Sequence, residues 1–229
     1  LRFYSLTTKT MYLHKEGRKL LLSVALVSAA MDIPMLLLVE DWTFFHIFFM
    51  ALPLLLWCFF LFFFRIPRRD LHKDSQTFIA PADGVICAIE ETFVKEYLDC
   101  EALQISIFMS ATNVHVNRYP ADGTVEYVKY HKGNYFMAAY PKSSTLNEHS
   151  SVGMLLANGQ RILLRQVAGV MARRIVCYAQ EGQQVKQNDE MGFIKFGSRV
   201  DLFVPMGTPL CVEMQEAVRN GITPLALLQ

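Results

Sequence analysis

The stretch Lys195-Phe196-Gly197-Ser198-Arg199-Val200-Asp201-Leu202-Phe203-Val204-Pro205 places a serine directly after a glycine, between two short apolar runs of β type. A Gly-Ser step is by itself common in turns, because glycine supplies a positive φ and serine bonds to nearby backbone. The run from Val200 to Val204 has the composition of a strand. We therefore expect a break at Gly197-Ser198 followed by a strand, and the role of Ser198 depends on its context.

Short runs of β pattern recur from Thr77 onward and are separated by turn residues at the spacing of β-sandwiches or barrels. The runs are residues 84–89, 103–108, 124–128 and 161–164. The clearest hairpin joins 154–157 to 160–167 through Asn158-Gly159, a pair that favours a two-residue type I′ turn. One short helical pattern covers Cys211 to Val218. We expect residues 70–229 to form a mainly β, compact sandwich or barrel-like domain.

Two segments of this domain, 182–185 and 188–192, resemble the tight turns of biotinyl/lipoyl-type hairpins. A carrier module of that type bears a lysine at a hairpin tip in a setting like Met-Lys-Met. The sequence has no such lysine, which argues against a carrier function.

The apolar excess of the chain, which is 52% hydrophobic, lies in its first 64 residues. Residues 20–39 and 42–64 are two nearly uninterrupted apolar runs, and only Glu40 and Asp41 separate them. Each run is close to the ~20 residues that cross a hydrocarbon core. We expect a transmembrane helical hairpin within an N-terminal anchor segment, residues 1–69.

The charges that flank the two apolar runs predict the orientation of the hairpin. Basic residues precede the first run and follow the second, whereas the tip is acidic; they are Lys15, Arg18, Lys19, Arg65, Arg68 and Arg69. The positive-inside rule then places the following domain on the cytoplasmic side of the cell (inner) membrane. A signal peptide is disfavoured because a second apolar run follows at once. A helical hairpin buried in a soluble core is the other alternative.

Composition excludes several functional classes. A net charge of +1 gives no footprint for nucleic acid, so no nucleic-acid partner is expected. Five cysteines without a CxxC pair favour reduced thiols over a disulfide frame or a zinc site. The six histidines show no close ligand spacing, so we expect no metal.

Four segments in fixed order carry a family resemblance. They are Phe64-Arg65-Ile66-Pro67-Arg68, Pro81-Ala82-Asp83-Gly84, Val114-His115-Val116-Asn117-Arg118-Tyr119-Pro120 and Phe196-Gly197-Ser198-Arg199. In type and order they resemble the phosphatidylserine decarboxylases, in particular the short-chain bacterial and archaeal branch, over roughly residues 60 to 213. The resemblance implies that the chain cuts itself between Gly197 and Ser198, and that Ser198 becomes a pyruvoyl group.

The resemblance also implies roles for individual residues. Ser198 is the nucleophile of self-cleavage, and as the pyruvoyl group it forms a Schiff base with the amine of phosphatidylserine. His115 is the general base and acid, Asp83 orients His115, and Arg118 binds substrate. Phosphatidylserine becomes phosphatidylethanolamine and carbon dioxide at the membrane surface, without a metal. The β chain (1–197) and the α chain (198–229) remain associated.

Two positions depart from the long-chain members of the family. Arg199 follows the serine, and Arg118 stands where those members carry a second histidine. Both features match the short branch, and they leave open whether His115 serves both self-cleavage and decarboxylation. That branch also contains enzymes acting on ether lipids, so a diacyl or an ether substrate is left open, as is assembly into a homo-oligomer.

The same residues also allow interpretations that involve no self-cleavage. Taken alone, Asp83 in Pro-Ala-Asp-Gly has a turn signature, and His115 could face solvent on a strand. The chain could be a membrane-tethered β-domain that binds a lipid or a partner and never cuts itself. A serine hydrolase is disfavoured because no Gly-x-Ser-x-Gly surrounds Ser198.

Overall fold

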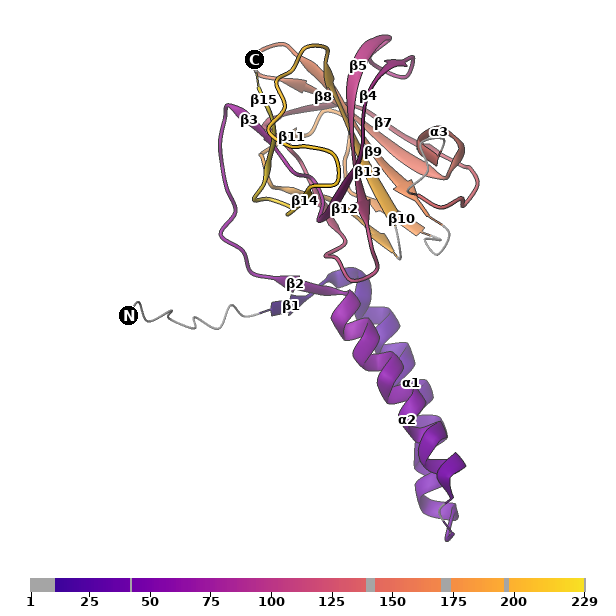
Figure 1. The fold of residues 1–229 in the computed structure, drawn as a ribbon. Helices are drawn as coiled ribbons and strands as arrows, with labels where there is room; N and C mark the ends of the chain where they lie inside the picture. The colour runs from indigo at the N-terminus through magenta and orange to yellow at the C-terminus, as the bar shows by residue number, and fades with distance from the viewer. Residues whose placement is uncertain (1–10, 42, 139–142, 170–173, 196–197, 229) are drawn as a thin grey trace, which may run out of the picture. The chain divides into compact units, whose positions relative to one another are not determined.

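A computed structural model describes residues 11–41, 43–138, 143–169, 174–195 and 198–228. The chain divides into two compact units, residues 1–68 and 69–229. In the first unit, helices α1 (Lys15–Leu38) and α2 (Phe44–Phe63) pack side by side (Figure 1). The short strands β1 (Met11–Leu13) and β2 (Arg65–Pro67) pair antiparallel and join the two outer ends of the helices.

Within the described residues, α1 and α2 are the two helices long and apolar enough to cross a membrane. A helix of 20 residues spans about 30 Å, the thickness of a hydrocarbon core. Most of their side chains are exposed in the unit itself, for example Leu37 at 78%, and Gly17, Leu21 and Phe63 are the buried ones among the described residues. The predicted apolar helices are confirmed, and α1 begins earlier than expected because the side chain of His14 caps its first turn by accepting from the Glu16 N–H.

The second unit is built on a curled antiparallel sheet. Among the described residues it has eight strands in the order β11-β7-β8-β9-β13-β5-β4-β14. They are β4 (Gly84–Val94), β5 (Cys100–Met109), β7 (Gly123–His131), β8 (His149–Leu156), β9 (Arg161–Ala168), β11 (Gln184–Val185), β13 (Ser198–Pro205) and β14 (Ala217–Val218). Four of them cover the four sequence runs with β pattern and extend each run, which confirms the mainly β prediction.

Smaller elements complete the second unit. One sheet has the order β10-β12-β6, and β15 pairs with β3. They are β3 (Thr77–Ile79), β6 (Val116–Arg118), β10 (Arg174–Cys177), β12 (Glu190–Lys195), β15 (Pro224–Leu227) and the one-turn helix α3 (Ser143–Leu146). Ile107 and Leu164 of the large sheet share one apolar core with Phe78, Ile194 and Leu225 of the smaller elements.

Strand β13 lies inside the large sheet, between β9 and β5 (Figure 1). Successive side chains of a strand point to opposite faces, so Ser198, Val200 and Leu202 share the face that forms the apolar core. Arg199 and Asp201 lie on the opposite face and are also fully buried. The strand is therefore buried on both sides, although it carries Arg199 and Asp201 between its apolar residues.

Two local predictions are wrong in detail. The hairpin between β8 and β9 exists, but the Leu156 N–H donates to the Gln160 carbonyl and closes a loop of three residues, 157–159, in which Gly159 alone has a left-handed φ, 84°. The Gly159 N–H donates to the Leu156 carbonyl and Asn158 is not left-handed, so the turn is not type I′. Residues 211–218 form no helix, because Gln215 has a φ of 66° and Ala217–Val218 pair with β4.

Candidate active site

Ser198 is the first residue of β13 and is fully buried. Its backbone lies between Met109, the last residue of β5, and Ala168, the last residue of β9. The Ser198 hydroxyl donates to the Met109 sulfur at 3.3 Å. A thioether is a weak acceptor, so breaking this hydrogen bond costs little when a base takes the hydroxyl proton. The other half of the predicted cleavage site, Gly197, lies outside the described residues.

His115 is fully buried and immediately precedes β6. Its Nδ1 lies 2.9 Å from the Asn113 carbonyl oxygen. A carbonyl only accepts, so Nδ1 carries the proton and the lone pair of the neutral ring is on Nε2. The His115 ring lies 6.2 Å from that of Phe193 on β12, the strand that leads toward Ser198. The ring is thus in a tautomer that can accept a proton.

Asp83 is buried at the start of β4, and its carboxylate is held by a bidentate arginine. Arg69 donates to both oxygens at 2.5 and 2.6 Å, and the Asn220 N–H donates at 2.8 Å. The described contacts of Asp83 do not include His115. Asn220, which donates its N–H to Asp83, also donates its side-chain amide to the carbonyl of Val116, the residue after His115. A direct role of Asp83 in orienting His115 stays a prediction.

Arg118 lies on β6 and is partly buried. Its guanidinium donates to the Asn188 carbonyl at 2.6 Å, and its backbone N–H donates to the Pro81 carbonyl at 2.9 Å. The second bond places the strand that follows His115 beside the loop that carries Asp83. The described contacts of Arg118 are structural, so substrate binding by this residue stays a prediction.

Sequence reasoning missed a buried amide pair beside Ser198. Asn117 and Gln166 are both fully buried, and Gln166 Nε2 donates to Asn117 Oδ1 at 2.8 Å. Asn117 Nδ2 in turn points at the Met109 sulfur, 3.6 Å away. Met109 therefore contacts both the Ser198 hydroxyl and the Asn117 amide. A glutamine among the apolar residues 162–168 was the available sequence signal.

On the opposite face of β13, Arg199 and Asp201 form a fully buried ion pair with an N–O distance of 2.5 Å. Arg199 also donates to the Ser106 hydroxyl at 2.8 Å, and the Ser144 hydroxyl donates to Asp201 at 2.6 Å. Burial acts to lower the pKa of Arg199, but the charge and hydrogen bond of Asp201 outweigh it and raise that pKa. The pair ties the strand of the candidate nucleophile to β5 and to α3.

A second polar cluster on the same unit brings together Glu96, His131 and His149, whose ligand atoms lie within 4.8 Å of one another. No sequence pattern indicates this cluster, because the three residues lie far apart in the chain. Glu96 already accepts hydrogen bonds at 2.8 Å from Ser151 and from Arg165. Burial alone would raise the pKa of Glu96, but the hydrogen bonds from Ser151, His131 and Arg165 lower it to about 2. The positive charge of Arg165 and these hydrogen bonds stabilise the Glu96 carboxylate, which is the role that a metal ion would have at this position.

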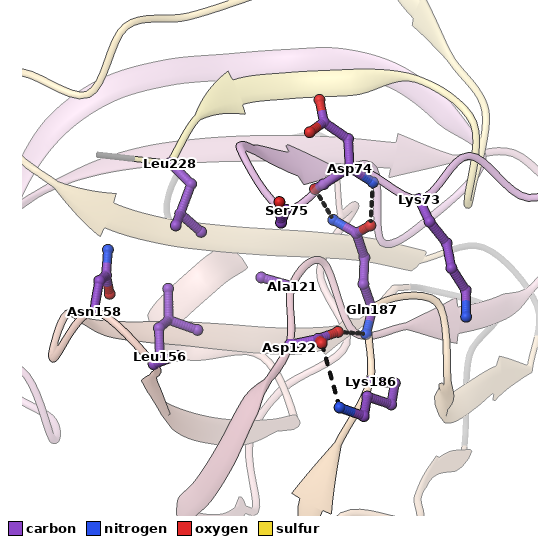
Figure 2. A pocket seen from close by; sticks show the side chains of 11 residues that line it. Lys73, Asp74, Ser75, Ala121, Asp122, Leu156, Asn158, Lys186, Gln187 and Leu228 are labelled. Carbon is purple, nitrogen blue, oxygen red and sulfur yellow. Dashed lines mark hydrogen bonds and ion pairs between the residues drawn. The ribbon is translucent and has the colours of Figure 1, made fainter.

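An open pocket on the second unit involves none of the predicted site residues (Figure 2). At its centre the Gln187 side chain bonds to the backbone of Asp74, and the Gln187 N–H donates to Asp122 at 2.6 Å. Lys186 pairs with the other Asp122 oxygen at 3.5 Å. The polar groups at its centre thus bond to one another, and nothing there resembles the chemistry around Ser198.

Comparison with known proteins defines the class. The family model described as phosphatidylserine decarboxylase matches residues 56–226. A phosphatidylserine decarboxylase proenzyme of Parabacteroides distasonis is 47% identical over 221 residues, which cover 95% of this chain and 99% of the relative. The proenzyme of Phocaeicola vulgatus is 41% identical over 222 residues, covering 96% and 97%. That of Amoebophilus asiaticus is 48% identical over 166 residues, covering 72% and 74%.

All three relatives are named as decarboxylase proenzymes, and the first two align with nearly the whole length of this chain. The chain belongs to the phosphatidylserine decarboxylase family.

Proposed function

We propose that this protein is a self-processing, pyruvoyl-dependent phosphatidylserine decarboxylase that works at a membrane surface. The observation that carries the proposal is the environment of Ser198. This buried serine opens a central strand, its hydroxyl donates to a thioether among the described residues, and it stands where the family pattern places the residue that is cleaved. His115, in the proton-accepting tautomer, precedes β6, which pairs with β12.

Self-cleavage requires a nucleophile and a base. His115 takes the Ser198 hydroxyl proton, and Oγ attacks the Gly197 carbonyl carbon. The peptide C–N bond breaks and an ester forms, while the Ser198 nitrogen becomes a free amine. Removal of the Ser198 α-proton then expels the Gly197 carboxylate and leaves dehydroalanine. Water replaces the nitrogen, ammonia leaves, and residue 198 becomes a pyruvoyl group.

The strand pairing supports continued association of the two fragments after cleavage. Residues 198–229 supply β13, β14 and β15, and each pairs with a strand from residues 1–197. β13 alone pairs along its length with β5 and along most of it with β9. Backbone hydrogen bonds and buried apolar faces do not depend on a continuous chain, so a cut before Ser198 leaves these contacts in place.

The residues around Ser198 suit a carbonyl group at position 198. Met109 and the adjoining core are apolar, so the site can hold an uncharged pyruvoyl group. The pyruvoyl group supplies an electron sink that lets the substrate carboxylate leave as carbon dioxide. His115 then returns the proton that replaces the carboxylate, which gives phosphatidylethanolamine. Arg118 is assigned to substrate binding and Asp83 to the orientation of His115.

The two apolar helices support action on a lipid. A phospholipid headgroup is met at the surface of a bilayer, and α1 and α2 are each long enough to cross one. The basic residues at the outer ends of the two helices favour the cytoplasmic side of the cell membrane for residues 69–229.

Intact mass of the denatured protein tests the proposal. We expect two fragments, 1–197 and 198–229, with the smaller one lighter by one ammonia than simple hydrolysis would make it. Ser198→Ala should give a single full-length chain. His115→Ala and Asp83→Ala should accumulate precursor, and Arg118→Ala should cleave but turn over poorly. A wild-type chain that stays uncut in lipid would instead support a tethered lipid- or partner-binding domain.

A further inference from the structure

The acceptor oxygen of Gln166 is buried close to Ser198 and has no donor in the described part of the chain. Gln166 lies opposite Val200 on β9, two residues from Ala168, which lies opposite Ser198. Gln166 and Ser198 are therefore diagonal neighbours on the same face of the sheet, within reach of a long side chain. A buried acceptor without a donor is unfavourable, and such an atom beside a reacting residue points to a ligand.

The orientation of this amide is fixed by its neighbours. Gln166 Nε2 donates to Asn117 Oδ1, and Asn117 Nδ2 is directed to the Met109 sulfur. These contacts use the nitrogen of the Gln166 amide, so its oxygen, Oε1, is the atom that can accept from a ligand. Gly192 of β12 provides the space. A Cβ at that position would come within 2.7 Å of Gln166 Nε2 and 3.2 Å of its Oε1. The Met109 sulfur contacted by Asn117 is the same atom that accepts from the Ser198 hydroxyl.

The chemistry of the open atom selects the group that it binds. A carbonyl oxygen pairs only with a donor, whereas the carboxylate and phosphate of a phosphoserine headgroup are acceptors. The donor that such a substrate brings is its primary amine, which is also the group that must reach position 198. We propose that Gln166 Oε1 receives an N–H of the substrate amine and positions its nitrogen for attack, with Asn117 as the residue that orients Gln166.

This inference rests on the proposed function and extends it to a headgroup contact. It makes Gln166 a residue of substrate capture, active before the loss of carbon dioxide. Self-cleavage involves no substrate amine, so the two steps respond differently to substitution of Gln166.

The test uses the full-length protein in detergent and glycerophosphoserine, a soluble headgroup without acyl chains. Gln166→Met and Gln166→Ala remove the acceptor, and Gln166→Glu retains it, since Asn117 can rotate to donate to the carboxylate. Three quantities are measured. They are the mass of the self-cleavage products, the rate of reaction of residue 198 with hydroxylamine, and the fraction of the 198–229 fragment that borohydride reduction links to the headgroup. The linked fragment gains the mass of glycerophosphoserine less one water and plus two hydrogens, and it is counted with or without the loss of carbon dioxide.

We expect every variant to cleave itself and to react with hydroxylamine as the wild type does. Capture of glycerophosphoserine should fall about tenfold or more in Gln166→Met and Gln166→Ala, and stay within about threefold of wild type in Gln166→Glu, as for one lost hydrogen bond to an amine or ammonium group.

Three results would overturn the inference. One is wild-type capture by Gln166→Met or Gln166→Ala. Another is an equal loss in all three variants, because Gln166→Glu retains an acceptor for the substrate amine. The last is failure of both acceptor-lacking variants to cleave while Gln166→Glu cleaves, which would assign the oxygen to maturation. Failure of the proposed function looks different, because the wild type itself would then stay uncut and unreactive to hydroxylamine.

Discussion

Asp201→Asn should destabilise the second unit strongly, because it removes the counter-charge of a fully buried arginine. Arg199 and Asp201 are each 0% exposed at the side chain. An arginine does not neutralise itself by losing a proton, so Arg199 would remain charged, with its bond to Ser106. Breaking a buried pair in this way costs about 3–5 kcal/mol. For a unit of this size that corresponds to a fall in Tm of about 6–20 °C.

The melt is best followed by far-UV circular dichroism of the β-sheet, in a Ser198→Ala background that keeps the chain uncut. Tryptophan fluorescence would not serve, because both tryptophans, Trp42 and Trp57, belong to the first unit. The matched control is Glu126→Gln, which breaks the exposed pair Arg161–Glu126, an N–O contact of 3.2 Å with Arg161 59% exposed. Such surface pairs contribute less than about 1 kcal/mol.

A compensating variant separates charge burial from packing. Arg199→Met combined with Asp201→Leu removes both charges and should recover most of the Tm lost by Asp201→Asn. The reasoning is refuted if Asp201→Asn melts as the Glu126→Gln control does. It is refuted equally if the double variant is no more stable than the single one, since the loss would then come from shape and not from the removal of the Asp201 charge.

Three further outcomes are expected. Because the pKa of Glu96 is lowered from 4.5 to about 2 in the folded state, its contribution to stability is complete above pH 4.5 and is lost as the pH falls toward 2. The free energy of unfolding, measured by urea titration between pH 2 and 4.5, should therefore change less with pH in Glu96→Gln than in the wild type. An equal dependence on pH in the two proteins would contradict the shift. Met109→Leu conserves volume and should cost less than about 1.5 kcal/mol, with self-cleavage still complete by mass, because the sulfur holds Ser198 but is no base; an uncut chain would give the sulfur a chemical role. Arg69→Gln deprives the buried Asp83 carboxylate of its bidentate partner, so it should lower stability by about 1–3 kcal/mol and slow the time course of self-cleavage. The control Arg68→Gln, at an exposed residue, should change neither stability nor cleavage. Equal effects of the two variants would show that the Arg69–Asp83 pair contributes to neither.

The failures of sequence prediction were local and have physical causes. Asn158-Gly159 correctly marked a hairpin, but pairing of the flanking strands extended the loop to three residues and left only Gly159 with a positive φ. The helical pattern of 211–218 was overridden because Ala217 and Val218 pair with the edge of β4. In both places tertiary pairing decided between conformations that the local sequence permits equally well.

The sequence by itself determined the elements and the family. Two apolar runs near 20 residues predict helices that can span a membrane, alternation predicts strands, and four motifs in order indicate a phosphatidylserine decarboxylase. These signals are periodic or contiguous, so they can be recognised without knowledge of long-range contacts.

Only the tertiary structure decided which polar side chains meet. Gln166 and Asn117 lie 49 residues apart, and Ser144 and Asp201 lie 57 apart, yet both pairs are hydrogen-bonded in the interior. Strand register sets these contacts, and register depends on the packing of the whole sheet. For the same reason the sequence could name Asp83 but could not show that Arg69 and Asn220 hold its carboxylate.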